Sequence, residues 1–129
     1  MIVKKGINTS FYEVKKDDIK GLFLKFFITA EDAGSSDSIW IMEFEPHGYA
    51  KMHSHKEEHY LYVMNGVCTV RKPGEEDLTA AEGDCIYISS CEEHEIENTG
   101  DLPLKMVSFM AILKGATGRS TTPCRNIKK

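Results

Sequence analysis

The sequence predicts an all-β protein folded as a single domain. Three observations support this fold class: the chain has only 129 residues, turn-forming residues interrupt it at short intervals, and the segments between them are rich in β-branched and aromatic side chains. A chain of this length has room for one hydrophobic core, and 41% of its residues are hydrophobic. We expect the domain to span residues 1–114.

Nine segments are expected to be strands, because each combines strand-forming side chains with flanking turn residues. In chain order they are residues 11–14, 22–28, 38–45, 59–64, 67–72, 77–80, 85–88, 93–98 and 104–113. The most specific turn is Asn65-Gly66, since a two-residue type I′ turn needs positive φ at both positions and these residues tolerate it well. This pair predicts a hairpin between segments 59–64 and 67–72.

Alternation along the strands assigns their two faces, because successive side chains point in opposite directions. Glu43, Glu45 and Lys105 mark the outer face of segments 38–45 and 104–113. The inward side chains are then expected to line a mostly apolar pocket for a small molecule: Trp40, Met42, Phe44, Met106, Ser108 and Met110. Segment 59–64 is apolar on both faces, because Tyr60 and Tyr62 occupy the outer one, and this predicts a homodimer.

Charge and composition exclude several classes of partner. A net charge of -4 argues against nucleic-acid binding, which needs an excess of Lys and Arg. The most apolar stretch, residues 22–28, contains Lys25 and is far shorter than the roughly 20 residues of a membrane-spanning helix, so we expect a soluble, cytoplasmic protein. Reduced thiols are expected, with Cys124 exposed. Residues 115–129 are basic and predict a tail that is flexible or packed on a partner.

Three of the five histidines fall within the run His53-Ser54-His55-Lys56-Glu57-Glu58-His59. In an extended segment His53 and His55 share a face, and His94, on a separate strand, supplies a long-range contact that could close a metal site. Zinc, iron, manganese and nickel ions all accept imidazole nitrogen. Runs of this kind also occur as solvated surface patches, so the histidines alone leave both interpretations open.

The spacing of the glycines and other motif residues around these histidines resembles that of the cupins. Their first motif is a glycine, five residues, H-x-H, three or four residues, a glutamate, six residues and a glycine. The stretch from Gly48 to Gly66 follows it, with four residues before His53 instead of five and with His59 in the position of the glutamate. The second motif is a glycine, five residues, P-x-G, two residues, a histidine, three residues and an asparagine. The stretch from Gly83 to Asn98 resembles it.

In that second stretch, Ser89 stands in the position of the proline and Cys91 in that of the second glycine. The resemblance covers most of the chain up to about residue 114 and implies a double-stranded β-helix, or jelly-roll barrel. The H-x-H-x-x-E-H run is similar to that of small single-domain cupins that bind manganese through four histidines. This implies one divalent transition metal per chain, with manganese favoured over iron, nickel and zinc, on four ligands: His53, His55, His59 and His94.

Other ligand sets remain open. Cys91 lies three residues before His94, and Glu58 could bind the metal if His59 turned away, whereas Glu57 is expected to meet solvent. Four neutral imidazoles would leave the ion its full double charge and make it a strong Lewis acid. Tetrahedral zinc, by contrast, would have no open position and the site would be structural.

The sequence assigns no catalytic residues, because it shows no carboxylate pair, no Ser-His-Asp order and no nucleotide-binding loop. Any reaction must therefore depend on the metal. Our leading hypothesis is a dioxygenase-type oxidoreductase acting on a small oxygen-bearing compound in the barrel. Metal-dependent isomerase or lyase chemistry and a non-catalytic metal or small-molecule binding module are the alternatives.

Overall fold

The structure is a computed structural model, and it describes residues 1–33, 37–111 and 124. The predicted tail, residues 115–129, lies outside the described residues apart from Cys124. Among the described residues, no helix has the length and apolar character needed to cross a membrane.

The described chain is almost entirely β, as predicted. A 3-10 turn, η1 (Gly6–Asn8), and a four-residue helix, α1 (Ala30–Ala33), accompany nine strands: β1 (Tyr12–Glu13), β2 (Ile19–Ile28), β3 (Ser38–His53), β4 (Glu58–Asn65), β5 (Val67–Arg71), β6 (Leu78–Ala81), β7 (Cys85–Ile88), β8 (His94–Asn98) and β9 (Leu104–Ala111). Each expected strand is present, with bounds that differ by a few residues at most, except for the much longer β3.

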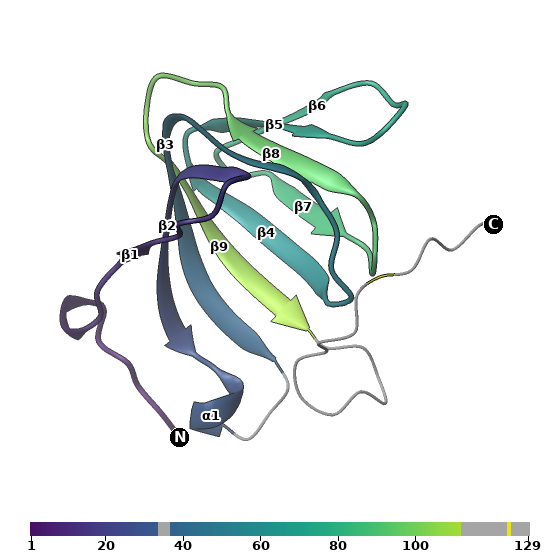
Figure 1. Cartoon of the computed structure of the whole chain (residues 1–129). Coiled ribbons are helices and arrows are strands. Elements are labelled where there is room, and N and C mark those ends of the chain that lie inside the picture. Colours follow the sequence, from purple (N-terminus) through teal and green to yellow (C-terminus); the bar gives the residue numbers. More distant parts are fainter. Residues whose placement is uncertain (34–36, 112–123, 125–129) are drawn as a thin grey trace.

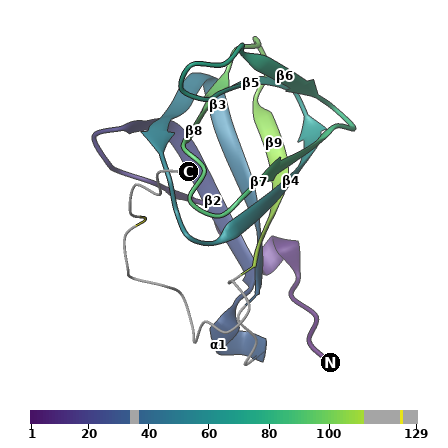
Figure 2. The same ribbon diagram turned by 90° about the vertical axis from the view of Figure 1, so that its right-hand side faces the viewer.

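One sheet rolls up into a nearly closed barrel, with the strand order β6-β5-β8-β3-β9-β4-β7. Strand β2 pairs with β3 and β1 pairs with β2, outside this path. The first view shows the strands running side by side around the barrel, and the second view looks into it (Figures 1 and 2). Strands β6 and β7 are the two ends of the path, so the barrel is open between them.

Strand β3 turns the main corner of the barrel. Its first half pairs with β9 and its second half with β8, and the bend between them lies at Pro46, His47 and Gly48. A Cβ atom on Gly48 would lie 2.8 Å from the carbonyl oxygen of Lys20, so only glycine allows this approach of β2. The predicted strand 38–45 therefore continues through the bend and ends at His53.

The predicted hairpin between β4 and β5 is wrong. Strand β4 pairs with β7 and β9, whereas β5 pairs with β6 and β8, so the turn carries the chain from one side of the barrel to the other. Of the turn pair, only Gly66 has positive φ, at 90°, and the Asn65 amide donates to the carbonyl of Pro103 over 2.9 Å. Each of the two strands therefore pairs with two other strands of the barrel and not with its neighbour in sequence.

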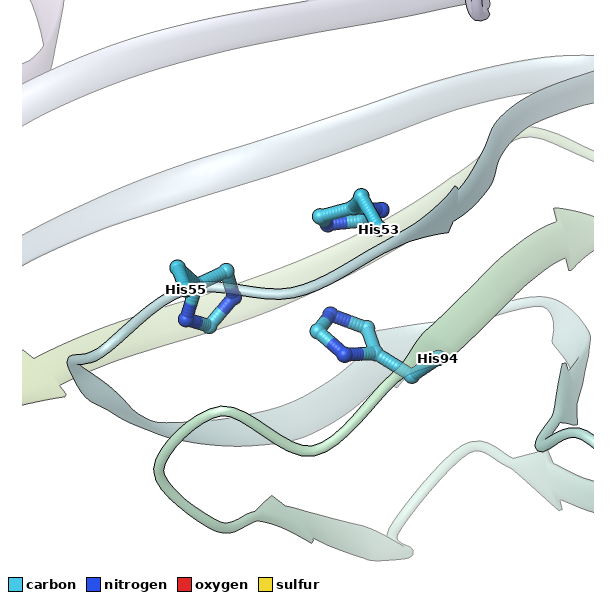
Figure 3. Close-up of side chains that lie close together, drawn as sticks. All are labelled: His53, His55 and His94. Atoms are coloured by element: carbon cyan, nitrogen blue, oxygen red, sulfur yellow. The ribbon is translucent and has the colours of Figure 1, made fainter. Parts of the chain in front are cut away.

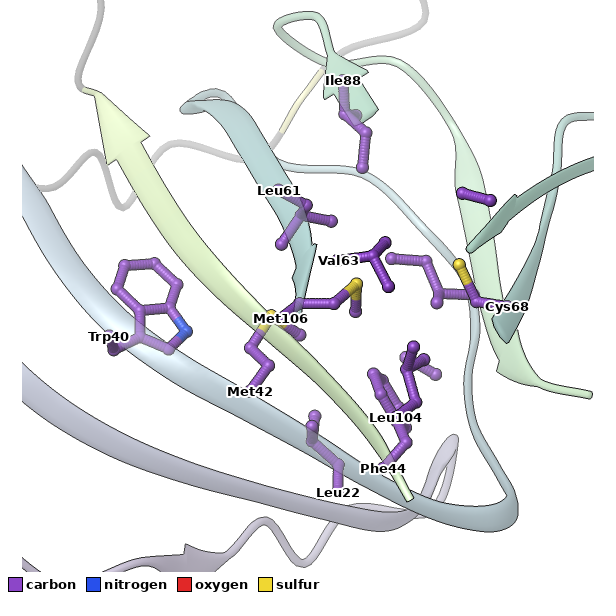
Figure 4. Packing of buried hydrophobic residues seen from close by; sticks show 13 residues of the cluster. Leu22, Trp40, Met42, Phe44, Leu61, Val63, Cys68, Ile88, Leu104 and Met106 are labelled. Carbon is purple, nitrogen blue, oxygen red and sulfur yellow. The ribbon is translucent and has the colours of Figure 1, made fainter. Parts of the chain in front are cut away.

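The core fills the barrel with the inward side chains that alternation predicted (Figure 4). Trp40, Met42, Phe44 and Met106 are all buried, and on the outer face the ammonium of Lys105 lies 3.5 Å from the Glu43 carboxylate. Asn98 closes the end of the barrel away from the histidines, and its buried amide donates to two backbone carbonyls, over 3.0 and 2.9 Å.

Candidate metal centre

Three imidazoles converge at one end of the barrel. His53 ends β3, His55 lies in the loop that follows, and His94 begins β8, paired in register with His53. Each ring offers one ligand nitrogen, and these three nitrogens all lie within 4.8 Å of one another. The close-up shows the three rings turned toward a common space (Figure 3). The sheet register thus supplies the long-range contact that the sequence suggested.

Backbone hydrogen bonds fix which nitrogen of each ring carries the hydrogen. The Nδ1 atoms of His53, His55 and His94 lie 2.7, 2.9 and 2.7 Å from the carbonyl oxygens of residues 51, 57 and 92. A carbonyl oxygen can only accept, so each Nδ1 carries the hydrogen and donates it. Each neutral ring therefore keeps its lone pair on Nε2. Such a second contact orients a metal-binding histidine and makes it more basic.

His59 stands next to this cluster without being part of it. Its ring centre on β4 is 5.5 Å from that of His55, but its nitrogens are not among those within the 4.8 Å group. Nε2 is hydrogen-bonded to the Ser108 hydroxyl, and Nδ1 is buried with no hydrogen-bond partner among the described residues. A buried nitrogen without a partner is costly, and a bond to a metal ion would remove that cost.

Burial keeps two of the histidines neutral. Desolvation, with smaller contributions from the neighbouring imidazoles, lowers the pKa of His59 to about 3. Desolvation also lowers the pKa of His94 to about 4, although its hydrogen bond to a backbone carbonyl opposes the shift. Both rings are therefore uncharged at neutral pH, which is the state that binds a metal ion.

One carboxylate at the site was not expected from the sequence. Glu57 was predicted to meet solvent, but it is only 6% exposed, and its Oε2 atom has no hydrogen-bond partner among the described residues. It lines a cavity of about 440 Å³, here called the histidine cavity, together with Lys16, Asp18, Ile19, Lys51, His53, Ser54, His55 and Met110. No sequence signal separates Glu57 from its charged neighbours, since the loop that buries it has no regular alternation.

Glu58, the alternative ligand, lies on the outside of the barrel. Its carboxylate accepts a hydrogen bond from the Tyr87 hydroxyl, at an exposed position. The two adjacent glutamates therefore have opposite environments, one buried at the histidines and one on the surface.

The predicted pocket residues do point inward, but most of them fill the core. Four of the six, Trp40, Met42, Phe44 and Met106, belong to the buried cluster. Ser108 is hydrogen-bonded to His59, and Met110 is the one residue of this predicted set that lines the histidine cavity. A second cavity, of about 810 Å³, lies at the opening of the barrel. It is lined by residues of β6 and β7, the two edge strands, and by His94. A ligand-binding role for the predicted set stays a prediction.

Two of the four cysteines differ from the expectation that all thiols are reduced. Cys91 and Cys124 form a disulfide, so the expectation of reduced thiols is wrong for these two residues. Cys91 has a φ of 60°, the left-handed conformation that favours glycine, at the position where the resemblance places a glycine. Its backbone N–H donates to the carbonyl of His55 over 2.7 Å. With its sulfur in the disulfide, Cys91 has no thiolate to offer a metal.

Comparisons with known proteins agree with this fold. A family model described as the cupin domain matches residues 40–110, which is more than half of the chain. Mannose-1-phosphate guanylyltransferases of Salmonella muenchen and Salmonella typhimurium are 29% and 34% identical over 62 residues, or 48% of this chain. The chain spans only 13% and 12% of the length of these two relatives.

Solved structures share the whole fold at low sequence identity. A predicted oxalate decarboxylase from Thermotoga maritima has a TM-score of 0.77 at 22% identity, covering 87% of this chain and 100% of that one. The polyketide cyclase RemF from Streptomyces resistomycificus has a TM-score of 0.78 at 17% identity, covering 95% and 87%. The cupin domain of Drosophila melanogaster CENP-C has a TM-score of 0.66 at 24% identity, covering 84% and 80%.

Proposed function

The chain belongs to the cupin family, and from that premise we propose that it binds one divalent transition metal ion at His53, His55, His59 and His94. The observation that carries this proposal is the set of three hydrogen bonds from Nδ1 to backbone carbonyls. They place the lone pair of each neutral ring on Nε2, and one ligand nitrogen from each ring lies within 4.8 Å of the other two. Manganese is our first choice because of the resemblance to the manganese-binding cupins, and iron, nickel and zinc are the alternatives because imidazole suits them as a ligand.

His59 is proposed as the fourth ligand. In its favour are its burial, its closeness to the ring of His55 and its Nδ1 atom without a partner. The Ser108 hydroxyl would then serve as the contact that orients the ring. The four ligands differ in this respect, because three of them are oriented by backbone and one by a side chain.

We further propose that the protein is a metal-dependent oxidoreductase of the dioxygenase type, acting on a small oxygen-bearing organic compound. When bound, the metal supplies Lewis acidity and redox chemistry. The chain would hold the ligand in the histidine cavity, and burial lowers the pKa of His59 and His94 so that these two imidazoles stay neutral. No acid and base pair is assigned among its residues.

Two alternatives are kept because similar structures include a polyketide cyclase and a predicted oxalate decarboxylase, whose names describe chemistry without dioxygenation. The first is isomerase or lyase activity, which would proceed without oxygen. The second is a binding module without turnover. Oxygen uptake by metal-loaded protein, measured with dicarbonyl and phenolic compounds, separates them. Turnover under nitrogen would refute the dioxygenase proposal, and ligand binding with no turnover would favour the binding module.

The metal site itself is tested by elemental analysis of protein purified without added metal. We expect about one ion per chain in the native protein and a large loss of that ion in the variants His53→Gln and His94→Gln. His47→Asn is the matched control, because His47 lies on the same strand as His53 but at the bend, outside the cluster. A metal-free native protein, or equal metal content in all variants, would contradict the site.

A homodimer is proposed through the outer face of β3, β9, β4 and β7. A row of exposed apolar side chains crosses these strands in register: Ile39 beside Phe109, Phe109 beside Tyr60, and Tyr60 beside Tyr87. Contiguous exposed apolar patches often mark sites of protein–protein interaction. Sedimentation should give a dimer for the native chain and a monomer for Tyr60→Lys, and a native monomer at high concentration would refute the proposal.

A further inference from the structure

The histidine cavity contains a hydrogen-bond acceptor that the metal site does not use. Glu57 is more than nine-tenths buried, lines the same cavity as His53 and His55, and has a carboxylate oxygen without a partner among the described residues. A buried acceptor oxygen without a hydrogen-bond donor reduces the stability of the fold by about 1 to 3 kcal/mol. Rotation about the terminal torsion of glutamate is soft, so either oxygen can turn toward the cavity. A ligand that brings a donor would satisfy it.

The charges around the cavity indicate the rest of the ligand. Its lining holds two lysines, Lys16 and Lys51, and two carboxylates, Asp18 and Glu57. These side-chain charges balance, so the double charge of an ion on neutral imidazoles would remain uncompensated and would attract an anion. A carboxylate is the small organic anion that best suits a hard divalent ion and the lysine ammonium groups.

We propose that the histidine cavity binds a hydroxycarboxylate, and that Glu57 accepts a hydrogen bond from the hydroxyl of this ligand. The anionic end meets the metal and the lysines, while the hydroxyl meets Glu57, the buried one of the two carboxylates that line the cavity. Glu57 is then a specificity residue. It discriminates against the matching acid without a hydroxyl, because that ligand would leave the buried oxygen unpaired. This inference rests on the proposed metal site.

The test compares two ligands that differ by one hydroxyl, lactate and propionate, on manganese-loaded protein by titration calorimetry. Lactate can also chelate the ion by itself, so the informative quantity is how the ratio of the two affinities changes between variants. We expect Glu57→Leu to reduce the preference for lactate by about tenfold, which corresponds to about 1.4 kcal/mol. Glu57→Gln keeps the shape and one carbonyl acceptor, and we expect a smaller reduction.

Glu58→Leu is the matched control, because Glu58 is the adjacent residue in sequence and its carboxylate is engaged with Tyr87 on the outside. It should leave the ratio unchanged. Metal content is measured on every sample, so that a misfolded or metal-free variant is recognised. If Glu57→Leu is such a variant, the comparison is made with Glu57→Gln.

The possible outcomes distinguish a failure of this inference from a failure of the proposed metal site on which it rests. Native protein that takes up no metal would overturn both. Metal-loaded protein whose preference for lactate is the same in the native chain, Glu57→Leu and Glu57→Gln would overturn the role of Glu57 alone. An equal loss of preference in Glu58→Leu would also overturn it, because the effect would then follow from the charge of the loop rather than from the buried acceptor.

Discussion

Acid should unfold the metal-free protein through its buried histidines. The pKa values of His59 and His94 are lowered to about 3 and about 4 in the folded state, whereas both lie near 6.5 in an unfolded chain. As the pH falls below 6.5, the unfolded state takes up protons that the folded state does not, so the free energy of unfolding falls. The loss continues down to about pH 4, where the folded-state His94 begins to take up its own proton.

The size of the effect follows from the number of protons. Each histidine that titrates only in the unfolded state contributes at most about 1.4 kcal/mol per pH unit. Two such histidines, between pH 6.5 and pH 4.5, therefore remove at most about 5 kcal/mol. The total stability of a small domain is about 5 to 15 kcal/mol. Metal-free protein should thus lose much of its stability by pH 4.5.

Urea unfolding followed by fluorescence measures this directly, because Trp40 is the one tryptophan and its ring centre is 5.6 Å from that of His59. The variant His94→Gln removes one of the two titrations and should roughly halve the dependence on pH. His47→Asn changes an exposed histidine at the bend of β3 and should keep the full dependence. An unfolding free energy that does not change between pH 7 and pH 5 in the metal-free protein would refute the reasoning.

Three further predictions concern the scaffold and are measured by urea unfolding. Asn98→Ala removes two hydrogen bonds donated by the buried amide and one accepted from a backbone N–H, and should cost about 3 kcal/mol; a cost below 1 kcal/mol would contradict this role. Cys124→Ser opens a disulfide that spans 33 residues in sequence and should cost about 3 to 4 kcal/mol under oxidising conditions, with no difference from the native chain after reduction. Gly66→Ala places a Cβ 2.8 Å from the carbonyl of Pro103 at a φ of 90° and should destabilise the protein; native-like stability would show that the crossing turn relaxes.

The strands were predictable because each depends on a local pattern. Segment 85–88 was expected within its observed bounds, and the inward positions of Trp40 and Met106 follow from alternation with charged neighbours. Strand β3 was cut short in the prediction because Pro46 and Gly48 are turn-forming residues. The structure uses them to bend a continuous strand, and that choice depends on the close approach of β2, which local sequence does not encode.

The candidate site was predictable in its residue types and only partly in its arrangement. The resemblance to the cupins indicated His53, His55, His59 and His94, and the structure brings the ligand nitrogens of three of them, His53, His55 and His94, into one group. The burial of Glu57 was missed, because a charged run in a loop has no period from which burial can be read. The pairing of Cys91 with Cys124 was missed for a related reason, since spacing along the chain does not reveal a contact across 33 residues.

The sequence alone determined an all-β domain of short strands, the imidazoles available to a metal, and which side chains turn inward, while the barrel was implied by the resemblance to the cupins. These properties follow from side-chain chemistry and from an alternation that extends over a few residues. The tertiary structure decided which strands are neighbours, which ring nitrogen each backbone carbonyl engages, and which of two adjacent glutamates is buried at the histidines. Those outcomes depend on contacts between residues far apart in the chain, and such contacts exist only once the barrel has closed around them.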